Sequence, residues 1–294
     1  MTRIAVVGAR GQLGAVVVHE FRSDHDVIGL THGDLDINDP VAVQKTMAAV
    51  VPDVIINCAA YNAVDAAEDR PLDALRTNAL AVRSLARAAT AADAVLIHCG
   101  TDFVFDGTID RPYVEDDAPN PRSVYATSKL LGEWFAIDTP RHYVLRVESL
   151  FGRAPDGPPA KGSVQSIVEA LGRGAVARVF EDRTVSPTYV PHAARAMREL
   201  LARQVPSGVY HCVSSGYCTW LEFALTAAEI LGVEPRVQPV RVADVTLRAA
   251  RPKYCALSNA KLAAAGIEMP TWKAALEDYL STFVNDLRNQ PAHG

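Results

Sequence analysis

The sequence has few cysteines, few aromatic residues and no long apolar run, and each shortage excludes a class of protein. Its five cysteines are odd in number and scattered along 294 residues, so neither a disulfide framework nor a zinc site is expected. Lys and Arg (29) do not outnumber Asp and Glu (34), and no basic stripe with interleaved aromatic residues stands out, so a nucleic-acid partner is not expected. No apolar run reaches the ~18–20 residues that a membrane-spanning helix needs. The chain begins directly with a strand-like segment rather than a leader, which favours a cytoplasmic protein without a membrane partner.

Short apolar runs rich in β-branched residues alternate with stretches of helical spacing in the first half of the chain. This alternation predicts an α/β fold with a doubly wound parallel sheet of the Rossmann type. The rhythm changes after residue 152. We therefore predict a dinucleotide-binding domain over residues 1–152, and mainly a smaller mixed α/β substrate lobe over residues 153–294, from which some elements return to the first domain. The expected strands are Arg3–Gly8, Asp26–Leu30, Val54–Asn57, Ala94–His98 and Tyr143–Val147.

A glycine-rich segment follows the first expected strand. In its G-x-x-G-x-x-G pattern, glycines permit a tight turn and a close approach of the backbone, and the following helix can hold a pyrophosphate at its N-terminus. A plain glycine turn is the alternative, but the position at the start of a β-α-β unit favours dinucleotide binding. The expected cofactor-binding residues are Gly8, Arg10, Gly11, Gln12, Leu13 and Gly14.

The end of the second expected strand bears on which dinucleotide is bound. Thr31 and His32 stand where an acidic residue would hold the ribose 2′-hydroxyl of NADH. We therefore expect a 2′-phosphate at this place, with Thr31 beside the cofactor and Arg10 supplying a positive charge. NADPH is favoured and NADH stays an alternative.

Two further segments carry candidate reacting groups near the carboxyl edge of the expected sheet. Tyr125 and Lys129 are four residues apart, so they lie on one face of a helix. A phenol has an ordinary pKa of about 10, and a nearby cation would help it to exchange a proton. The Thr101 hydroxyl can donate to a carbonyl oxygen on which negative charge develops. A tyrosine and a lysine at this spacing are common by chance, and the glycine loop and Thr101 upstream favour the catalytic interpretation.

These segments together resemble the extended short-chain dehydrogenase/reductase family, and within it the dTDP-4-dehydrorhamnose reductases. The resemblance covers nearly the whole chain. It runs through GARGQLG at Gly8–Gly14, LDINDP at Leu35–Pro40, PDVIINCAAYNAVDAAE at Pro52–Glu68, TDFVFDG at Thr101–Gly107, YATSK at Tyr125–Lys129 and RPKYCALS at Arg251–Ser258.

The resemblance implies reduction of the C4 ketone of a nucleotide-linked 4-keto-6-deoxy sugar by NAD(P)H, with dTDP-4-dehydrorhamnose as the expected substrate. Thr101, Tyr125 and Lys129 would form the catalytic set, supported by Asp102. Tyr125 would give the proton, Thr101 would hold the C4 oxygen, and Lys129 would hold a ribose hydroxyl while lowering the pKa of Tyr125. The other residues that the resemblance implies are Asp36 and Ile37 beside the adenine, Ala59, Ala60 and Tyr61 along the cofactor, and Phe103 and Arg251 at the substrate.

The chain departs from the family pattern at several positions. Arg146–Ser149 reads Arg-Val-Glu-Ser where such reductases usually have Arg-Thr-Ser-Trp, so the tryptophan expected in the sugar pocket is replaced by Ser149. Val16 stands where some members have a glutamate associated with magnesium at a dimer contact, so no metal is expected. The surfaces near the first helix could still support a homodimer. Asp36 could alternatively cap the helix expected near Pro40.

Three other functions remain open alternatives. A dehydratase of the same family needs an Asp-Glu pair directly after the threonine, and Phe103 follows Asp102 here, so dehydration is disfavoured. A sugar-nucleotide epimerase is the second. The third is a catalytically silent NADP-binding subunit that resembles the regulatory subunit of methionine adenosyltransferase.

Overall fold

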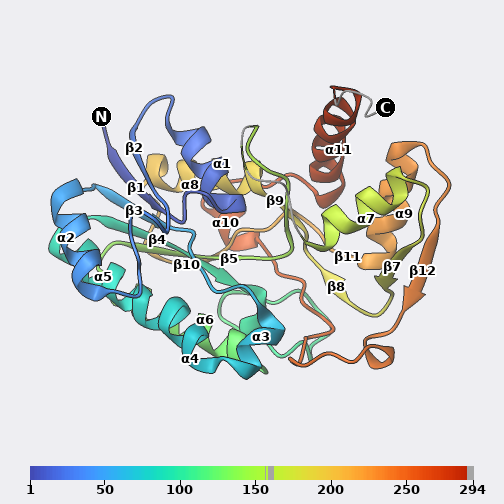
Figure 1. Cartoon of the computed structure of the whole chain (residues 1–294), viewed down its shortest axis with the longest axis horizontal. Coiled ribbons are helices and arrows are strands. Elements are labelled where there is room, and N and C mark those ends of the chain that lie inside the picture. Colours follow the sequence, from blue (N-terminus) through green and yellow to red (C-terminus); the bar gives the residue numbers. More distant parts are fainter. Residues whose placement is uncertain (156, 158–161, 290–294) are drawn as a thin grey trace.

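Six parallel strands form the central sheet of the computed structural model, which describes residues 1–155, 157 and 162–289, with side chains described as far as residue 282 (Figure 1). The strand order is β10-β5-β4-β3-β1-β2. All five strands expected from the sequence are present: β1, β3, β4 and β5 are apolar runs that the sheet buries, and β2 is the partly buried edge strand. The doubly wound α/β fold is confirmed. The strands are β1 (Arg3–Val7), β2 (Asp26–Leu30), β3 (Val54–Asn57), β4 (Val95–Thr101), β5 (His142–Val147) and β10 (Gly208–His211).

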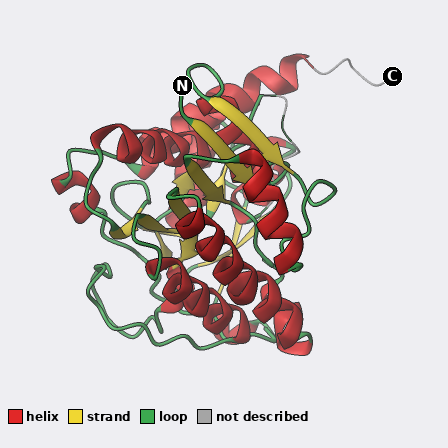
Figure 2. Cartoon of the chain, turned by 90° about the vertical axis from the view of Figure 1, so that its left-hand side faces the viewer, coloured by secondary structure: helices red, strands yellow, loops and turns green. Residues whose placement is uncertain are grey.

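Helices cover both faces of this sheet (Figures 1 and 2). On one face, α1 (Gln12–Phe21) packs beside α8 (Val190–Arg203), and Val17 and Met197 share one apolar core with the strands. On the other face lie α2 (Pro40–Val50), α5 (Ala81–Ala91) and α6 (Val124–Ile137), whose apolar residues form a second core.

Strand β10 comes from the second half of the chain and pairs with β5. Its sequence, Gly-Val-Tyr-His, is too short and too polar to be recognised as a strand by its pattern. It forms because Val209 and Tyr210 meet Val144 and Leu145 in register. Together with α8, β10 brings residues beyond position 153 into the layers of the central sheet.

A separate apolar core lies beside the sheet, on the right of Figure 1. It is built by α7 (Ser163–Gly172), α9 (Trp220–Leu231) and α11 (Trp272–Asn289), with the parallel strands β7 (Ala177–Phe180) and β12 (Val237–Val240). Phe223 and Trp272 pack at its centre. This core gives the second half of the chain a stable body of its own.

Short elements connect these bodies. Two-residue strands pair β6 (Leu150–Phe151) with β9 (Thr188–Tyr189) and β8 (Thr184–Val185) with β11 (Cys218–Thr219). The short helices are α3 (Val64–Asp69), α4 (Pro71–Leu75), α10 (Ala260–Ala264), the π-helix η1 (Arg76–Leu80) and the 3₁₀ helices η2 (Asp102–Val104) and η3 (Val242–Asp244). Among the described residues, no helix combines the length and the apolar character needed to cross a membrane.

Helix α6 approaches η1 closely because residue 132 is a glycine. A Cβ at Gly132 would overlap the carbonyl oxygen of Asn78. The Asn78 side chain is buried here and donates to the Ser128 hydroxyl at 3.0 Å, while its oxygen accepts from the Tyr61 amide at 2.8 Å. The contact therefore fixes α6 and the loop after β3 relative to each other.

We predict that Gly132→Ala destabilises the protein by about 1–3 kcal/mol, the usual cost of overpacking a core. The melting temperature should fall by several degrees in differential scanning calorimetry. Gly33→Ala is the control, because its Cβ would meet only the Thr31 hydroxyl at an ordinary 3.7 Å. Equal melting temperatures for the two variants would show that the approach at Gly132 is not tight.

Candidate active site

The glycine loop between β1 and α1 lies against the loop after β3. Gly8 has a φ of +79°, and a Cβ there would lie 2.8 Å from the amide nitrogen of Ala59. A Cβ at Gly14 would overlap the carbonyl oxygen of Gly8. Only glycines fit these two positions, so the backbone itself forms the floor of the candidate site.

The N-terminus of α1 is suited to a pyrophosphate. Its N-cap residue is Gly11, which has no side chain to bond the first amides, and the first turn contains no acidic residue. Backbone amides at a helix N-terminus attract anions. Gln12 points elsewhere, since its amide donates to the Gly152 carbonyl at 2.8 Å, and Leu13 is buried. The residues present thus fit a dinucleotide whose phosphates meet the backbone.

An acidic residue, Asp34, lies at the end of β2. The Asp34 carboxylate accepts from the Thr31 amide at 2.9 Å and from its hydroxyl at 2.6 Å. These bonds, and more weakly the charge of Arg10, lower the pKa of Asp34. The expectation that this place lacks an acidic residue was therefore incomplete. Asp34 follows the glycine loop at about the spacing of 20 residues that the motif specifies, which was the signal in the sequence.

The other expected cofactor residues flank this floor. Asp36 is exposed and accepts from the Asn38 amide at 3.0 Å, whereas Ile37 is buried. The cap of α2 is Asp39, which accepts from two amides of the first turn, so Asp36 does not cap that helix.

The loop from Ala59 through Ala60 to Tyr61 is held at both ends by asparagines. The Ala59 amide donates to the Asn57 side chain at 3.1 Å, and the Tyr61 amide donates to Asn78. This fixes the loop directly beside Gly8.

The structure brings Thr101, Asp102 and Tyr125 together. The Thr101 hydroxyl donates to Asp102 Oδ1 at 3.0 Å, and all three side chains are buried. Burial, and then the charge of Asp102, raise the pKa of Tyr125, whereas its hydrogen bond with Thr101 lowers it. Tyr125 therefore keeps its proton at neutral pH, the state that a proton donor needs. Burial raises the pKa of Asp102 to about 6.

Lys129 is buried one turn after Tyr125 on α6. Its ammonium donates to the carbonyl of Cys99 in β4 at 2.5 Å, and burial lowers its pKa. The ammonium group thus lies at the carboxyl end of β4. That Lys129 lowers the pKa of Tyr125 stays a prediction.

Two side chains that the sequence did not single out border this group. Arg183 lies within 5.9 Å of the Phe103 ring centroid and donates to Cys255 Sγ at 3.5 Å, and the Phe103 ring in turn meets Tyr125 edge to face at 5.9 Å. Glu148 is buried beside Asp102, and it accepts from the Ser186 amide at 2.5 Å. The local sequence around each gives no sign of this contact, because only the fold brings them to Asp102.

Arg251 lies at a different contact. Its guanidinium makes a bidentate ion pair with Asp65 of α3, with N–O distances of 2.9 and 2.8 Å. This bond lowers the pKa of Asp65 to about 2. A role of Arg251 toward a substrate phosphate stays a prediction, and any such phosphate would have to share Arg251 with Asp65.

Ser149 has a left-handed backbone, with a φ of +44°. This conformation is unfavourable for a bulky residue. Ser149, which stands in place of the expected tryptophan, therefore lies where the backbone turns into the left-handed region.

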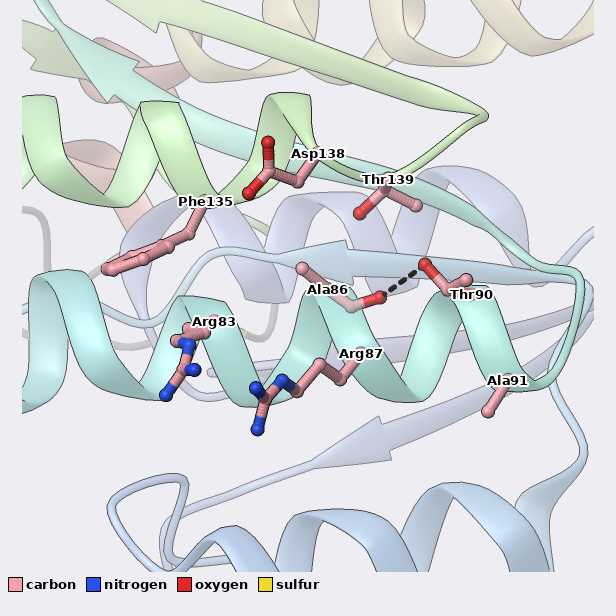
Figure 3. A pocket seen from close by; sticks show the side chains of 8 residues that line it. All are labelled: Arg83, Ala86, Arg87, Thr90, Ala91, Phe135, Asp138 and Thr139. Carbon is pink, nitrogen blue, oxygen red and sulfur yellow. Dashed lines mark hydrogen bonds between the residues drawn. The ribbon is translucent and has the colours of Figure 1, made fainter.

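A surface pocket between α5 and the C-terminal end of α6 is unrelated to this group (Figure 3). Arg83, Arg87 and Phe135 line it. Tyr125 and Lys129 lie in the first half of α6, so this pocket is not the candidate site.

The fold and these side chains together define a Rossmann-type oxidoreductase, with a glycine loop suited to a dinucleotide and a buried tyrosine and lysine at the carboxyl edge of the sheet. The chain belongs to the RmlD substrate binding domain family, whose model matches residues 1–285.

The relatives of the chain agree with this assignment. A dTDP-4-dehydrorhamnose reductase of Mycolicibacterium smegmatis is 35% identical over 98% of this chain and 88% of its own length. The crystal structure of a dTDP-4-dehydrorhamnose reductase from Clostridium acetobutylicum matches with a TM-score of 0.90 at 32% identity, covering 96% of this chain and 99% of that one. A Bacillus anthracis reductase of the same name, solved in complex with NADP, matches with a TM-score of 0.88 at 30% identity and the same coverage.

Arg10 and Asp34 should act in opposite directions on the choice of cofactor. Arg10→Ala removes a charged partner of the 2′-phosphate, which costs about 1.5–3 kcal/mol, so the Kd of NADPH should rise about 10- to 100-fold. The Kd of NADH should change little. Asp34→Asn removes a repulsive charge and should lower the Kd of NADPH.

Fluorescence titration of the purified variants with both cofactors tests this prediction. Arg22→Ala is the control, because Arg22 is exposed at the far end of α1. Equal losses of NADPH and NADH affinity in Arg10→Ala would contradict the assignment of Arg10 to the 2′-phosphate.

Proposed function

We propose that the protein is an NADPH-dependent reductase that converts dTDP-4-dehydrorhamnose to dTDP-rhamnose in the cytoplasm. The observation that carries the proposal is the buried group of Thr101, Asp102 and Tyr125 at the carboxyl edge of the sheet. Tyr125 shares an apolar cluster with Tyr61, in the loop that lies beside Gly8. The names of relatives that align over nearly the whole chain supply the substrate.

The chemistry that bound NADPH supplies is a hydride for the C4 carbon of the ketone. The Tyr125 phenol gives its proton to the C4 oxygen as the C–H bond forms, so the ketone becomes an alcohol. Thr101 turns its single hydroxyl proton from Asp102 to the same oxygen and stabilises its developing negative charge. Lys129, within reach of the Cys99 carbonyl, holds a ribose hydroxyl of the cofactor.

We also propose that residues 1–152 bind the dinucleotide and that residues 153–294 mainly bind the sugar nucleotide, with Phe103 and Arg251 at the substrate. The separate apolar core of the second body supports this division. A homodimer stays a prediction, which light scattering of the purified protein tests.

Tyr125→Phe should lose about 10²–10⁴-fold in kcat, the usual contribution of a general acid. Its affinity for NADPH should be unchanged, because the glycine loop is intact. The measurement is the decrease of NADPH absorbance with freshly generated dTDP-4-dehydrorhamnose.

Tyr210→Phe is the matched control, because Tyr210 lies in β10 and its hydroxyl bonds the Pro206 carbonyl. It should keep wild-type turnover. If the wild type binds NADPH without consuming it, the reductase proposal fails and a silent NADP-binding subunit becomes the better account. An interconversion of sugar epimers without net loss of NADPH would favour an epimerase.

A further inference from the structure

Two carboxyl groups are buried side by side next to Tyr125. In the parallel pairing of β4 with β5, Thr101 lies opposite Val147. Asp102 directly follows Thr101 and Glu148 directly follows Val147, so both residues lie at the carboxyl edge of the sheet. Asp102 is 4% exposed and Glu148 is 3% exposed. One carboxylate oxygen of each residue and Cys255 Sγ lie within 4.8 Å of one another.

Each carboxyl group has one partnered and one unpartnered oxygen. Asp102 Oδ1 accepts from Thr101, and Glu148 Oε2 accepts from the Ser186 amide. Asp102 Oδ2 and Glu148 Oε1 are buried and have no hydrogen-bond partner among the described residues. Buried polar atoms are rarely left unpartnered, and an ionised carboxylate can only accept. A proton on one of the two groups supplies the missing donor.

The charges around Asp102 and Glu148 also favour a single proton on this pair of carboxyl groups. Arg183 is the cation that faces both carboxyl groups within the described part of the chain. Two ionised carboxylates and one guanidinium leave a net negative charge in a buried place, whereas one added proton makes the group neutral. The other titratable groups that face the pair are Tyr125 of α6, Cys255 and Cys218.

We propose that Asp102 and Glu148 form one titrating pair that carries a single proton, and that Glu148 acts through this proton as a positioning residue for Asp102 and Thr101. With the proton present, the pair carries one negative charge, which Arg183 balances, and Asp102 stays in place beside Thr101, whose hydroxyl is free to turn to the substrate. Loss of the proton puts a second negative charge beside Asp102, whose own charge already opposes ionisation of Tyr125.

A divalent metal ion at the same three side chains is the competing account. It would require both carboxylates to be ionised, and it would meet the positive charge of Arg183. The structure therefore favours the proton over the metal.

The dependence of stability on pH tests the shared proton without any substrate. Burial raises the pKa of both groups above the value of about 4 that carboxyl groups have in unfolded chains. Such groups stabilise the fold at low pH, and this contribution is lost as the pH rises through the folded-state pKa. Glu148→Gln removes this decrease in stability at higher pH, because the glutamine amide accepts from Ser186 and donates to Asp102 at every pH.

We expect the melting temperature of Glu148→Gln, relative to wild type, to rise steadily between pH 5 and pH 8 in the full-length protein. Glu229→Gln, an exposed change on α9, is the control and should show a constant difference. A constant difference for Glu148→Gln as well would overturn the proposal. If that variant fails to fold, infrared spectra of the wild type decide. The carbonyl band of a buried protonated acid at pH 7 supports the pair, and its absence overturns it.

The kinetic consequence rests on the proposed function. With NADPH and dTDP-4-dehydrorhamnose, wild-type kcat should fall at higher pH, where the pair loses its proton. In Glu148→Gln, this falling limb of the pH profile of kcat should lie about 1 pH unit or more higher. An unchanged limb overturns the positioning role. If neither protein turns over substrate while the stability difference still depends on pH, the proposed function fails and the shared proton stands.

A rise in wild-type melting temperature with Mg²⁺ or Zn²⁺ that Glu148→Gln abolishes would establish the metal instead.

Discussion

The parallel register between β4 and β5 determines where the reacting groups lie. Because Thr101 pairs with Val147, the residues that follow each strand meet at one edge of the sheet. The same strand end offers the Cys99 carbonyl to Lys129, so α6 is tied to the edge that carries Thr101. A slip of this register would separate Asp102 from Glu148. The rest of the site is arranged around an edge that the strand pairing has already fixed.

Close packing of backbone segments holds the loops beside this edge in place. Gly8 lets the first loop approach Ala59, and Gly132 lets α6 approach Asn78, which in turn fixes Tyr61. Side chains are thus excluded from both contacts. Charged groups lie at two other places: Arg10 and Asp34 follow β1 and β2, and the pair of carboxyl groups lies with Arg183 at the ends of β4 and β5. Burial rather than ion pairing dominates the electrostatics beside Tyr125, and it keeps the phenol protonated.

The fold could be predicted from the sequence where local pattern and tertiary environment agree. The runs of β1, β3, β4 and β5 are apolar in sequence because a parallel sheet buries both of their faces, whereas β2 is a partly buried edge strand. Strand β10 could not be predicted, since its four residues become a strand only against β5. Thr101, Tyr125 and Lys129 were found by their motifs, whereas Glu148 and Arg183 reach Asp102 through strand register and loop packing. Asp34 was overlooked although its spacing from the glycine loop was visible.

The central claim is that this site transfers a hydride to C4 of the sugar. The most direct measurement uses NADPH that carries deuterium at C4 of its nicotinamide, on the face that is transferred, with dTDP-4-dehydrorhamnose and the wild-type enzyme, followed by mass spectrometry and NMR of the product. The account predicts one deuterium in dTDP-rhamnose, bonded to C4 of the sugar. Product without deuterium, or with deuterium at another carbon, when either face of the nicotinamide is labelled, would contradict it.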